Sequence, residues 1–239
     1  AAGRAGVPFT TGILVGIGET REDRIAALEA IAASHLVHGH VQEVIVQNFL
    51  PKPGTAMHAH PPCPPDEHLR AIALARLILP DEVHVQAPPN LADVGPLLAA
   101  GVSDLGGVSP VTIDHVNPER PWPHLDALAE ATTALGHQLA PRLTVHPRFV
   151  AEPDRWLHPD LHTAVLDRAD AEGLGRDDPG AVFPNRVGEV RNVGDGAEVV
   201  LVGRRSTAWY SGAGTAPTVI VGGPTTAVRG PVRDVLDGV

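Results

Sequence analysis

Short apolar runs alternate with segments of helical periodicity from residue 7 onward. The first run, residues 9–17, predicts a buried strand, and Thr20 with Asp23 three positions later predicts the capped start of a helix. Three more strand and helix pairs follow, with strands predicted at 42–49, 82–87 and 102–109 and helices at 66–79, from about Leu91, and at 124–139. Four βα units in succession predict a parallel sheet.

The composition of the predicted strands indicates how this sheet is built. Three of the four read as near-continuous runs of Val, Ile and Leu, which is typical of parallel strands covered on both faces in a barrel or a doubly wound sheet. A complete eightfold barrel takes ~250 residues. The pattern therefore predicts an α/β fold, half of a (βα)8-type TIM barrel, with open sheet edges at 9–17 and 102–109. Its interior face is expected to carry aliphatic side chains: Ile13, Val15, Val44 and Val46.

The amino-acid composition and the apolar pattern change along the chain and suggest four parts. Residues 1–140 hold the half barrel, and residues 141–183 form an extension with a short extended stretch and an amphipathic helix that packs on the barrel wall. Residues 184–229 are rich in Gly, Val and Thr and predict a linker with room for a small hairpin. Residues 230–239, GPVRDVLDGV, begin a new helical pattern.

Composition excludes several classes of protein. The 239 residues carry a net charge of -10 and show no cluster of Lys and Arg, which argues against nucleic acid as a partner. No apolar run approaches the ~18–20 residues that span a bilayer, so we expect a cytoplasmic protein without a membrane partner. The single cysteine, Cys63, excludes a disulfide framework and a cysteine-ligated cluster within this chain. The absence of an initiator methionine suggests a fragment.

Glycines punctuate the end of the first predicted strand. A dinucleotide-binding fingerprint would need a third glycine at position 21, where Arg21 stands, so that interpretation fails. Glycine within a strand marks a place where a ligand or another backbone approaches closely, and Gly12 and Gly16 are candidates for such an approach. The structural alternative is that these glycines relieve crowding within a barrel.

Polar side chains follow the next two strands. Lys52 is the only lysine among 18 basic residues and follows Asn48 at the mouth of the second strand, where barrel enzymes place their chemistry. A compact ammonium group could donate to a carbonyl or serve as an acid, although a solvent-facing lysine is the alternative. Gln86 and Asn90 hold the same position after the third strand and offer paired donors and acceptors, or ordinary turn chemistry.

Acids and hydroxyls surround the fourth strand. Asp104, Ser109 and Thr112 are candidates for binding substrate hydroxyls, and Asp104 is a candidate for relaying a proton. Asp114 is better explained as a loop or cap residue.

Histidines gather in two short segments, HLVHGH at 35–40 and a second set with Cys63 between His58 and His68. Neither has the paired spacing of a zinc module, so no metal site is predicted within this chain. A serine hydrolase is also disfavoured, because no GxSxG elbow occurs.

Several segments together resemble a known family. Gly12, Leu14, Gly16 and Glu19 resemble the GxIxGxxE motif of radical S-adenosylmethionine (SAM) enzymes, with leucine in the isoleucine position. Three longer segments resemble FO synthases, which make the deazaflavin chromophore FO (7,8-didemethyl-8-hydroxy-5-deazariboflavin): QNFLPKPGTAM at 47–57, VQAPPNL at 85–91 and DLGGVSPVTIDHVNPERPWP at 104–123. The resemblance covers residues 6 to about 180, and the final GPVRDVLDGV resembles the junction into the second module of the fused form.

The resemblance implies a fold, a reaction and a set of site residues. The chain would be the C-terminal half of the radical SAM barrel of the ring-forming module, a carbon-nitrogen lyase. That module closes the deazaflavin ring of an adduct of tyrosine and 5-amino-6-(D-ribitylamino)uracil with release of ammonia, and a second radical SAM module, a transferase, makes the adduct. Gly12, Gly16 and Glu19 would bind SAM, Asn48, Gln86, Asn90, Ser109 and Thr112 would bind the adduct, and Lys52 and Asp104 would be catalytic.

The sequence departs from this family in one respect. Radical SAM enzymes hold a 4Fe-4S cluster on a CxxxCxxC loop and receive electrons from a donor, and this chain has no such loop. The resemblance therefore implies a fragment that cannot cleave SAM by itself. The rival hypothesis from another class is a non-catalytic βα-repeat binding or scaffolding domain, complete as it stands, in which the glycines and prolines are purely structural.

Overall fold

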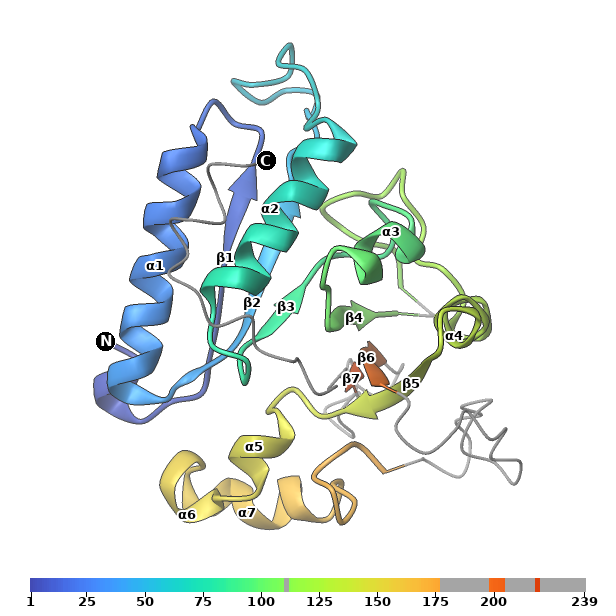
Figure 1. Ribbon diagram of the computed structural model, residues 1–239. Helices are drawn as coiled ribbons and strands as arrows, with labels where there is room; N and C mark the ends of the chain where they lie inside the picture. The colour runs from blue at the N-terminus through green and yellow to red at the C-terminus, as the bar shows by residue number, and fades with distance from the viewer. Residues whose placement is uncertain (110–111, 177–197, 205–217, 220–239) are drawn as a thin grey trace.

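The computed structural model describes residues 1–109 and 112–176, together with the backbone of 198–204 and 218–219 (Figure 1). These residues form an α/β protein around one mainly parallel sheet, whose strand order is β1-β2-β3-β4-β6-β5-β7. The strands are β1 (Phe9–Val15), β2 (Val41–Asn48), β3 (His84–Gln86), β4 (Asp104–Val108), β5 (His137–Arg142), β6 (Glu198–Arg204) and β7 (Thr218–Val219). The helices are η1 (Gly3–Ala5), α1 (Arg21–His38), α2 (Pro65–Ile78), α3 (Val94–Ala99), α4 (Leu125–Ala134), α5 (Pro147–Val150), α6 (Pro153–Trp156) and α7 (Pro159–Leu166).

The first four βα units are confirmed, and the local chemistry explains where they begin. Thr20 accepts a hydrogen bond from the Asp23 amide, and the Asp23 carboxylate accepts one from the Thr20 amide, so the predicted capping box starts α1. Gly39 ends this helix in the left-handed conformation that glycine adopts without strain. Pro65 stands in the first turn of α2, where a missing amide proton costs nothing.

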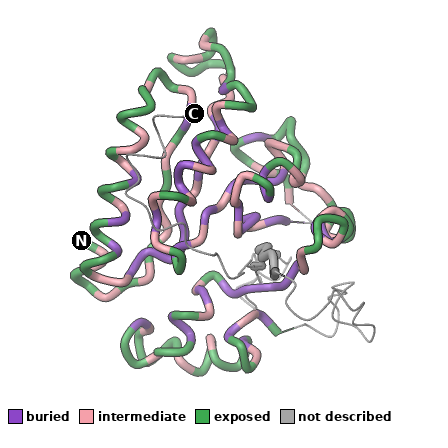
Figure 2. The backbone as a smooth tube through the Cα atoms, in the orientation of Figure 1, coloured by how far each residue is buried: buried purple, intermediate pink, exposed green. Residues whose placement is uncertain are grey.

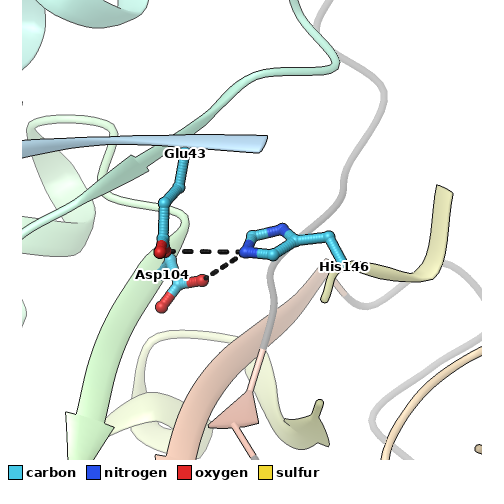
Figure 3. Close-up of side chains that lie close together, drawn as sticks. All are labelled: Glu43, Asp104 and His146. Carbon is cyan, nitrogen blue, oxygen red and sulfur yellow. Dashed lines mark ion pairs between the residues drawn. The ribbon is translucent and has the colours of Figure 1, made fainter. Parts of the chain in front are cut away.

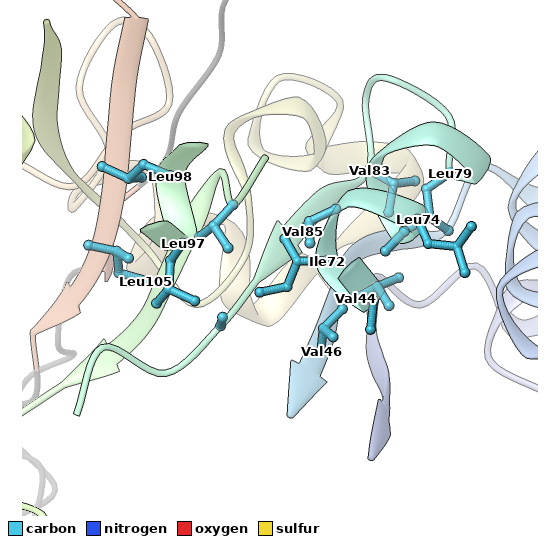
Figure 4. Close-up of a cluster of buried hydrophobic side chains, with 14 of the residues drawn as sticks. Val44, Val46, Ile72, Leu74, Leu79, Val83, Val85, Leu97, Leu98 and Leu105 are labelled. Atoms are coloured by element: carbon cyan, nitrogen blue, oxygen red, sulfur yellow. The ribbon is translucent and has the colours of Figure 1, made fainter. Parts of the chain in front are cut away.

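The apolar core lies between the helices and one face of the sheet (Figure 4). Val44, Val46 and Val85 are completely buried, as is Ile72 on α2, and Leu28 of α1 belongs to the same cluster. Burial of such side chains stabilises a fold by ~1.5–3 kcal/mol each. Leu77, also on α2, is exposed and does not belong to this core.

The other face of the sheet differs from the prediction. Val15, Val44 and Val46 are buried among the helix-facing side chains, and Ile13 packs against the same core. Successive side chains on a strand point to opposite faces, so the inner face carries the alternate residues. On β1 these are Gly12 and Leu14, which are exposed. The strands β2, β4 and β5 are in contrast mostly buried (Figure 2). The side chains predicted for the interior face therefore lie on the helix-covered face instead, and the prediction was shifted by one residue along each strand.

Three of the described strands, β5, β6 and β7, were not predicted as strands. Residues of β5 were assigned to the end of a helix and the start of the extension, but they pair in parallel with β6. Because β6 also pairs in parallel with β4, the 102–109 segment is not an open edge. Two parts of the predicted 184–229 linker, β6 and β7, are thus sheet strands, and the linker is not confirmed. The rest of the linker and the 230–239 segment lie outside the described residues. β1 pairs with β2 alone among the described strands.

The C-terminal extension packs as three short helices below the sheet (Figure 1). Phe149 and Trp156 meet edge to face with ring centroids 4.9 Å apart, which joins α5 to α6. The predicted amphipathic helix corresponds to α7. Among the described helices none combines the length and apolar character needed to cross a membrane.

Candidate active site

The carboxyl ends of β1 to β4 open into loops that meet at one edge of the sheet, as parallel strands require (Figure 1). Contacts between the loops show that they are neighbours. Asn48 after β2 donates to the Leu91 carbonyl at 3.5 Å, and Asn90 donates to Asp114 at 3.0 Å. Lys52 pairs with Glu119 across 67 positions of sequence. The loops after β2, β3 and β4 therefore contribute to one candidate site.

The loop after β1 is organised by Glu19. Its carboxylate accepts hydrogen bonds from the backbone amides of Gly16 and Ile17, each at 2.8 Å, and from the Nε of Arg24 at 2.8 Å. Partial burial opposes ionisation, but these donors outweigh it and lower the pKa of Glu19 from 4.5 to about 2. The lone pairs of Glu19 are thus used within the protein, so this residue holds the loop in shape.

Glu19→Gln is expected to reduce stability at neutral pH by about 1–2 kcal/mol, because amide amino protons would face the donors of Gly16 and Arg24. The folded-state pKa lies below the unfolded value of 4.5, so this contribution is complete above pH 4.5 and is lost as the pH falls toward about 2. Urea unfolding of both proteins between pH 2 and 7 should show curves that converge in acid. Glu29→Gln, at an exposed position of α1, serves as the control. A Glu19 difference that does not vary with pH would contradict this assignment.

The two glycines singled out in the sequence lie against protein atoms. A side chain at Gly12 would collide with the Ile45 carbonyl of the neighbouring strand. Gly16 has φ +95°, and a Cβ there would lie 2.8 Å from the Cβ of Cys63. Neighbouring protein atoms therefore leave no room for a side chain at either position, and binding of a ligand by these glycines stays a prediction. Gly18, with φ +105°, has nothing within 4 Å of its virtual Cβ.

Within the described part of the chain, two amide side chains have buried oxygen atoms without a hydrogen-bond partner, Asn48 Oδ1 and Asn90 Oδ1. Buried polar atoms are usually satisfied, so such oxygens indicate a place where a donor from a ligand fits. Asn90 is held by bonds from its Nδ2 to Asp114 and to the Arg120 carbonyl. Asp114 also accepts from Asn117 at 2.8 Å, and although burial opposes it, this hydrogen bonding lowers the Asp114 pKa. Asp114 is therefore the positioning residue of the loop, as the loop interpretation expected.

The other side chains predicted for the site, Ser109, Thr112, Gln86 and Lys52, make different contacts within the protein. Thr112 donates to Ser109 through both its amide and its hydroxyl, at 3.0 and 2.6 Å. Gln86 lies at mid-sheet, and its amide fills the space where a side chain at Gly106 would be. The Nζ of Lys52 lies 2.5 Å from Glu119, and Lys52 is partly exposed. This partner lowers the pKa of Glu119.

Asp104 lies away from the loops. It begins β4, is fully buried, and accepts hydrogen bonds from the Gly106 amide at 2.6 Å and the Nε of Arg142 at 2.7 Å. Glu43 on β2 accepts from the same guanidinium at 2.5 Å, and the Nε2 of His146 lies 3.5 Å from Glu43 and 3.6 Å from Asp104 (Figure 3). These four residues are called the acid cluster below.

Burial opposes charge throughout the acid cluster. At Glu43 the charge of Arg142 outweighs burial, and the pKa falls to about 2. At Asp104 burial, with a further contribution from Glu43, outweighs the attraction of Arg142 and raises the pKa to about 7. Burial and the Arg142 charge lower the pKa of His146 to about 4, so its ring is neutral at pH 7.

The sequence did not reveal the acid cluster. Arg142 is 38 positions from Asp104 and 99 from Glu43, so neither partner is visible in a local pattern. One signal was present, since Glu43 interrupts a run of apolar residues on a buried strand. Among the described residues the side chains that could together hold a metal ion are Glu43, Asp104 and His146, which lie outside the two histidine segments.

The described fold is that of an α/β protein consistent with part of a βα barrel, with a site at the carboxyl ends of its strands. Comparison of sequences identifies its relatives. The chain is 51% identical over 180 residues to the FO synthase of Mycobacterium tuberculosis (strain ATCC 25618 / H37Rv), covering 74% of this chain and 21% of that protein. It is 52% identical over 177 residues to the 7,8-didemethyl-8-hydroxy-5-deazariboflavin synthase of Methanopyrus kandleri, covering 73% of this chain and 52% of that protein.

A third relative is the 7,8-didemethyl-8-hydroxy-5-deazariboflavin synthase of Methanoculleus marisnigri, at 57% identity over 149 residues, covering 62% of this chain and 44% of that protein. These matches confirm the resemblance to FO synthases, and the chain corresponds to a part of these longer proteins. No family model matches the chain. No solved structure matches it either.

Proposed function

We propose that this chain forms part of an FO synthase and contributes to the module that closes the deazaflavin ring with release of ammonia. The observation that carries the proposal is the identity of 51–57% to synthases of this kind. Similar alignments cover 21% of the Mycobacterium protein and 52% of the Methanopyrus protein, so the former is more than twice as long. This difference supports a fused form with a second module, which would supply the adduct of tyrosine and 5-amino-6-(D-ribitylamino)uracil.

The side chains of the loops fit such an adduct. A uracil ring and a ribityl chain present N–H and O–H donors, and Asn48 and Asn90 offer buried, unpartnered oxygens. Ser109 and Thr112 follow β4, Gln86 ends β3 at a deeper level of the sheet, and all three would bind further hydroxyls. Lys52 would donate to a carbonyl of the adduct while Glu119 holds its ammonium group in place. Asp104 is buried beneath the site in the acid cluster, where it would act as a positioning residue.

The cofactors implied by the family fit this chain to different degrees. For SAM, which supplies a deoxyadenosyl radical when reduced, the loop from Gly16 to Glu19 offers a rigid turn flanked by exposed apolar side chains, Leu14 and Ile17. The 4Fe-4S cluster does not fit, because the chain has one cysteine and burial raises the pKa of the Cys63 thiol. The cluster and the electron donor would therefore be supplied from outside this chain.

A chimera tests the proposal. The aligned segment of this chain is exchanged into the Mycobacterium tuberculosis FO synthase, and FO and deoxyadenosine are measured by mass spectrometry. We expect FO formation. In the chimera Asn48→Ala should lower FO formation by about tenfold, the loss of one hydrogen bond of ~1.4 kcal/mol, while deoxyadenosine release persists. Glu29→Gln, on the exposed side of α1, should change neither product. A folded chimera that releases deoxyadenosine but no FO would contradict the proposed function.

A further inference from the structure

The acid cluster contains a histidine whose ring is buried without a hydrogen bond. His146 is 2% exposed, and neither its Nδ1 nor its Nε2 has a hydrogen-bond partner among the described residues. Its Nε2 points between the carboxylates of Glu43 and Asp104 (Figure 3). A buried imidazole usually donates or accepts at least once, so this orientation calls for a further ligand.

The distances within the acid cluster fit a metal better than a hydrogen bond. The Nε2 of His146 lies 3.5 Å from Glu43 Oε2 and 3.6 Å from Asp104 Oδ2, both beyond the ~2.7–3.2 Å range of an N–H···O bond. Two ligand atoms that are each ~2.1 Å from a tetrahedral zinc ion lie about 3.4 Å apart. The three ligand atoms all lie within 4.8 Å of one another.

The carboxylates are also held as metal-binding carboxylates are. The second oxygen of Glu43 accepts from the Thr10 hydroxyl at 2.8 Å, and the second oxygen of Asp104 accepts from the Gly106 amide at 2.6 Å. Such outer contacts fix the orientation of ligating groups. Arg142 donates hydrogen bonds to the same two carboxylate oxygens that face His146. Its single positive charge balances only one of the two carboxylate charges.

We propose that Glu43, Asp104 and His146 form a binding site for a divalent transition metal ion, with zinc as the probe, on the inner face of the sheet. Histidine nitrogen with carboxylate oxygen is a donor set that zinc, cobalt and manganese accept. Arg142 remains beside the ion, and its charge limits the affinity of the site. This site is separate from the loops that carry the proposed function, and it contains no cysteine.

The first test measures zinc and cobalt binding to the full chain after dialysis against a chelator. We expect one equivalent of Zn²⁺ to bind and to raise the melting temperature, and Co²⁺ to give visible absorption bands. His146→Leu should lower the apparent affinity at least tenfold and abolish those bands. Because the His146 ring makes no hydrogen bond, this variant should fold like the metal-free wild type. His58→Gln combined with His60→Gln removes two loop histidines outside the acid cluster and should leave the binding unchanged.

A second measurement does not depend on any variant. X-ray absorption of the zinc complex of the wild-type chain should show one imidazole nitrogen and oxygen ligands without sulfur. Absence of stoichiometric uptake, retention of the cobalt bands in His146→Leu, loss of binding in the loop-histidine variant, or two or more imidazoles in the zinc shell would each overturn the proposal.

Discussion

Replacing Arg142 with leucine is expected to lower the free energy of unfolding by about 3–5 kcal/mol. The guanidinium is buried and bonds Asp104 at 2.7 Å, Glu43 at 2.5 Å and the Leu143 carbonyl at 3.2 Å. Without it two carboxylates remain in the interior with no opposing charge, and breaking a buried pair from one side has this magnitude. Natural domains are stable by only ~5–15 kcal/mol, so the variant should lose a large part of its margin.

The measurement is urea unfolding at pH 7 in the presence of a chelator. Arg155→Leu is the matched control, since Arg155 pairs with Glu152 at the surface at 3.2 Å and should contribute within ~1 kcal/mol. Adding Asp104→Asn to Arg142→Leu removes one of the stranded charges and should recover part of the loss. Equal stability of the Arg142 and Arg155 variants would show that the acid cluster does not contribute as described.

Gly16→Ala is expected to be the second most damaging of these changes, at roughly 2–4 kcal/mol. Gly16 has φ +95°, where an L-residue is strained by ~1–2 kcal/mol, and the new methyl group would lie 2.8 Å from the Cβ of Cys63 and 3.0 Å from its Cα. Overpacking of this kind adds ~1–3 kcal/mol.

Gly18 provides the comparison that separates the two costs. With φ +105° it shares the backbone strain, but nothing lies within 4 Å of its virtual Cβ, so Gly18→Ala should cost only the conformational part. The difference between the two variants in urea unfolding reports the contact with Cys63. Cys63→Gly should reduce the difference in unfolding free energy between the two variants, because it removes the Cβ that the new methyl group at position 16 would contact. Equal costs for Gly16→Ala and Gly18→Ala would show that the loop yields to the methyl group.

Much of the fold could be predicted because its signals are local. The capping box of Thr20 and Asp23 is visible in a few residues of the sequence, and it is present in the structure. β5 could not be found this way, since its sequence, HQLAPR, mixes polar residues with a proline that argues against a strand. The strand β6 was missed for another reason: its apolar run lies in a glycine-rich region whose composition favoured a linker.

The candidate site also has a part that the sequence could predict and a part that it could not. Asn48, Asn90 and Asp114 follow strand ends, and parallel pairing alone brings them together. The sequence placed Asp104 with them, but the residue opens its strand, so its carboxylate lies below the loops. Its partners come from β5 and the segment after it, and no local pattern encodes a contact between residues that far apart.

The ion pairs of Arg142 also bear on the order in which the chain folds. Contacts such as the capping box of α1 join residues three positions apart, whereas Arg142 must close loops of 38 and 99 residues to meet its partners. Loop closure costs entropy before such contacts form, so the pairs of high contact order arise late. The acid cluster is therefore expected to act mainly on the rate of unfolding. Its ion pairs join the extension to the βα units after these units have formed, and they slow unfolding of the native state.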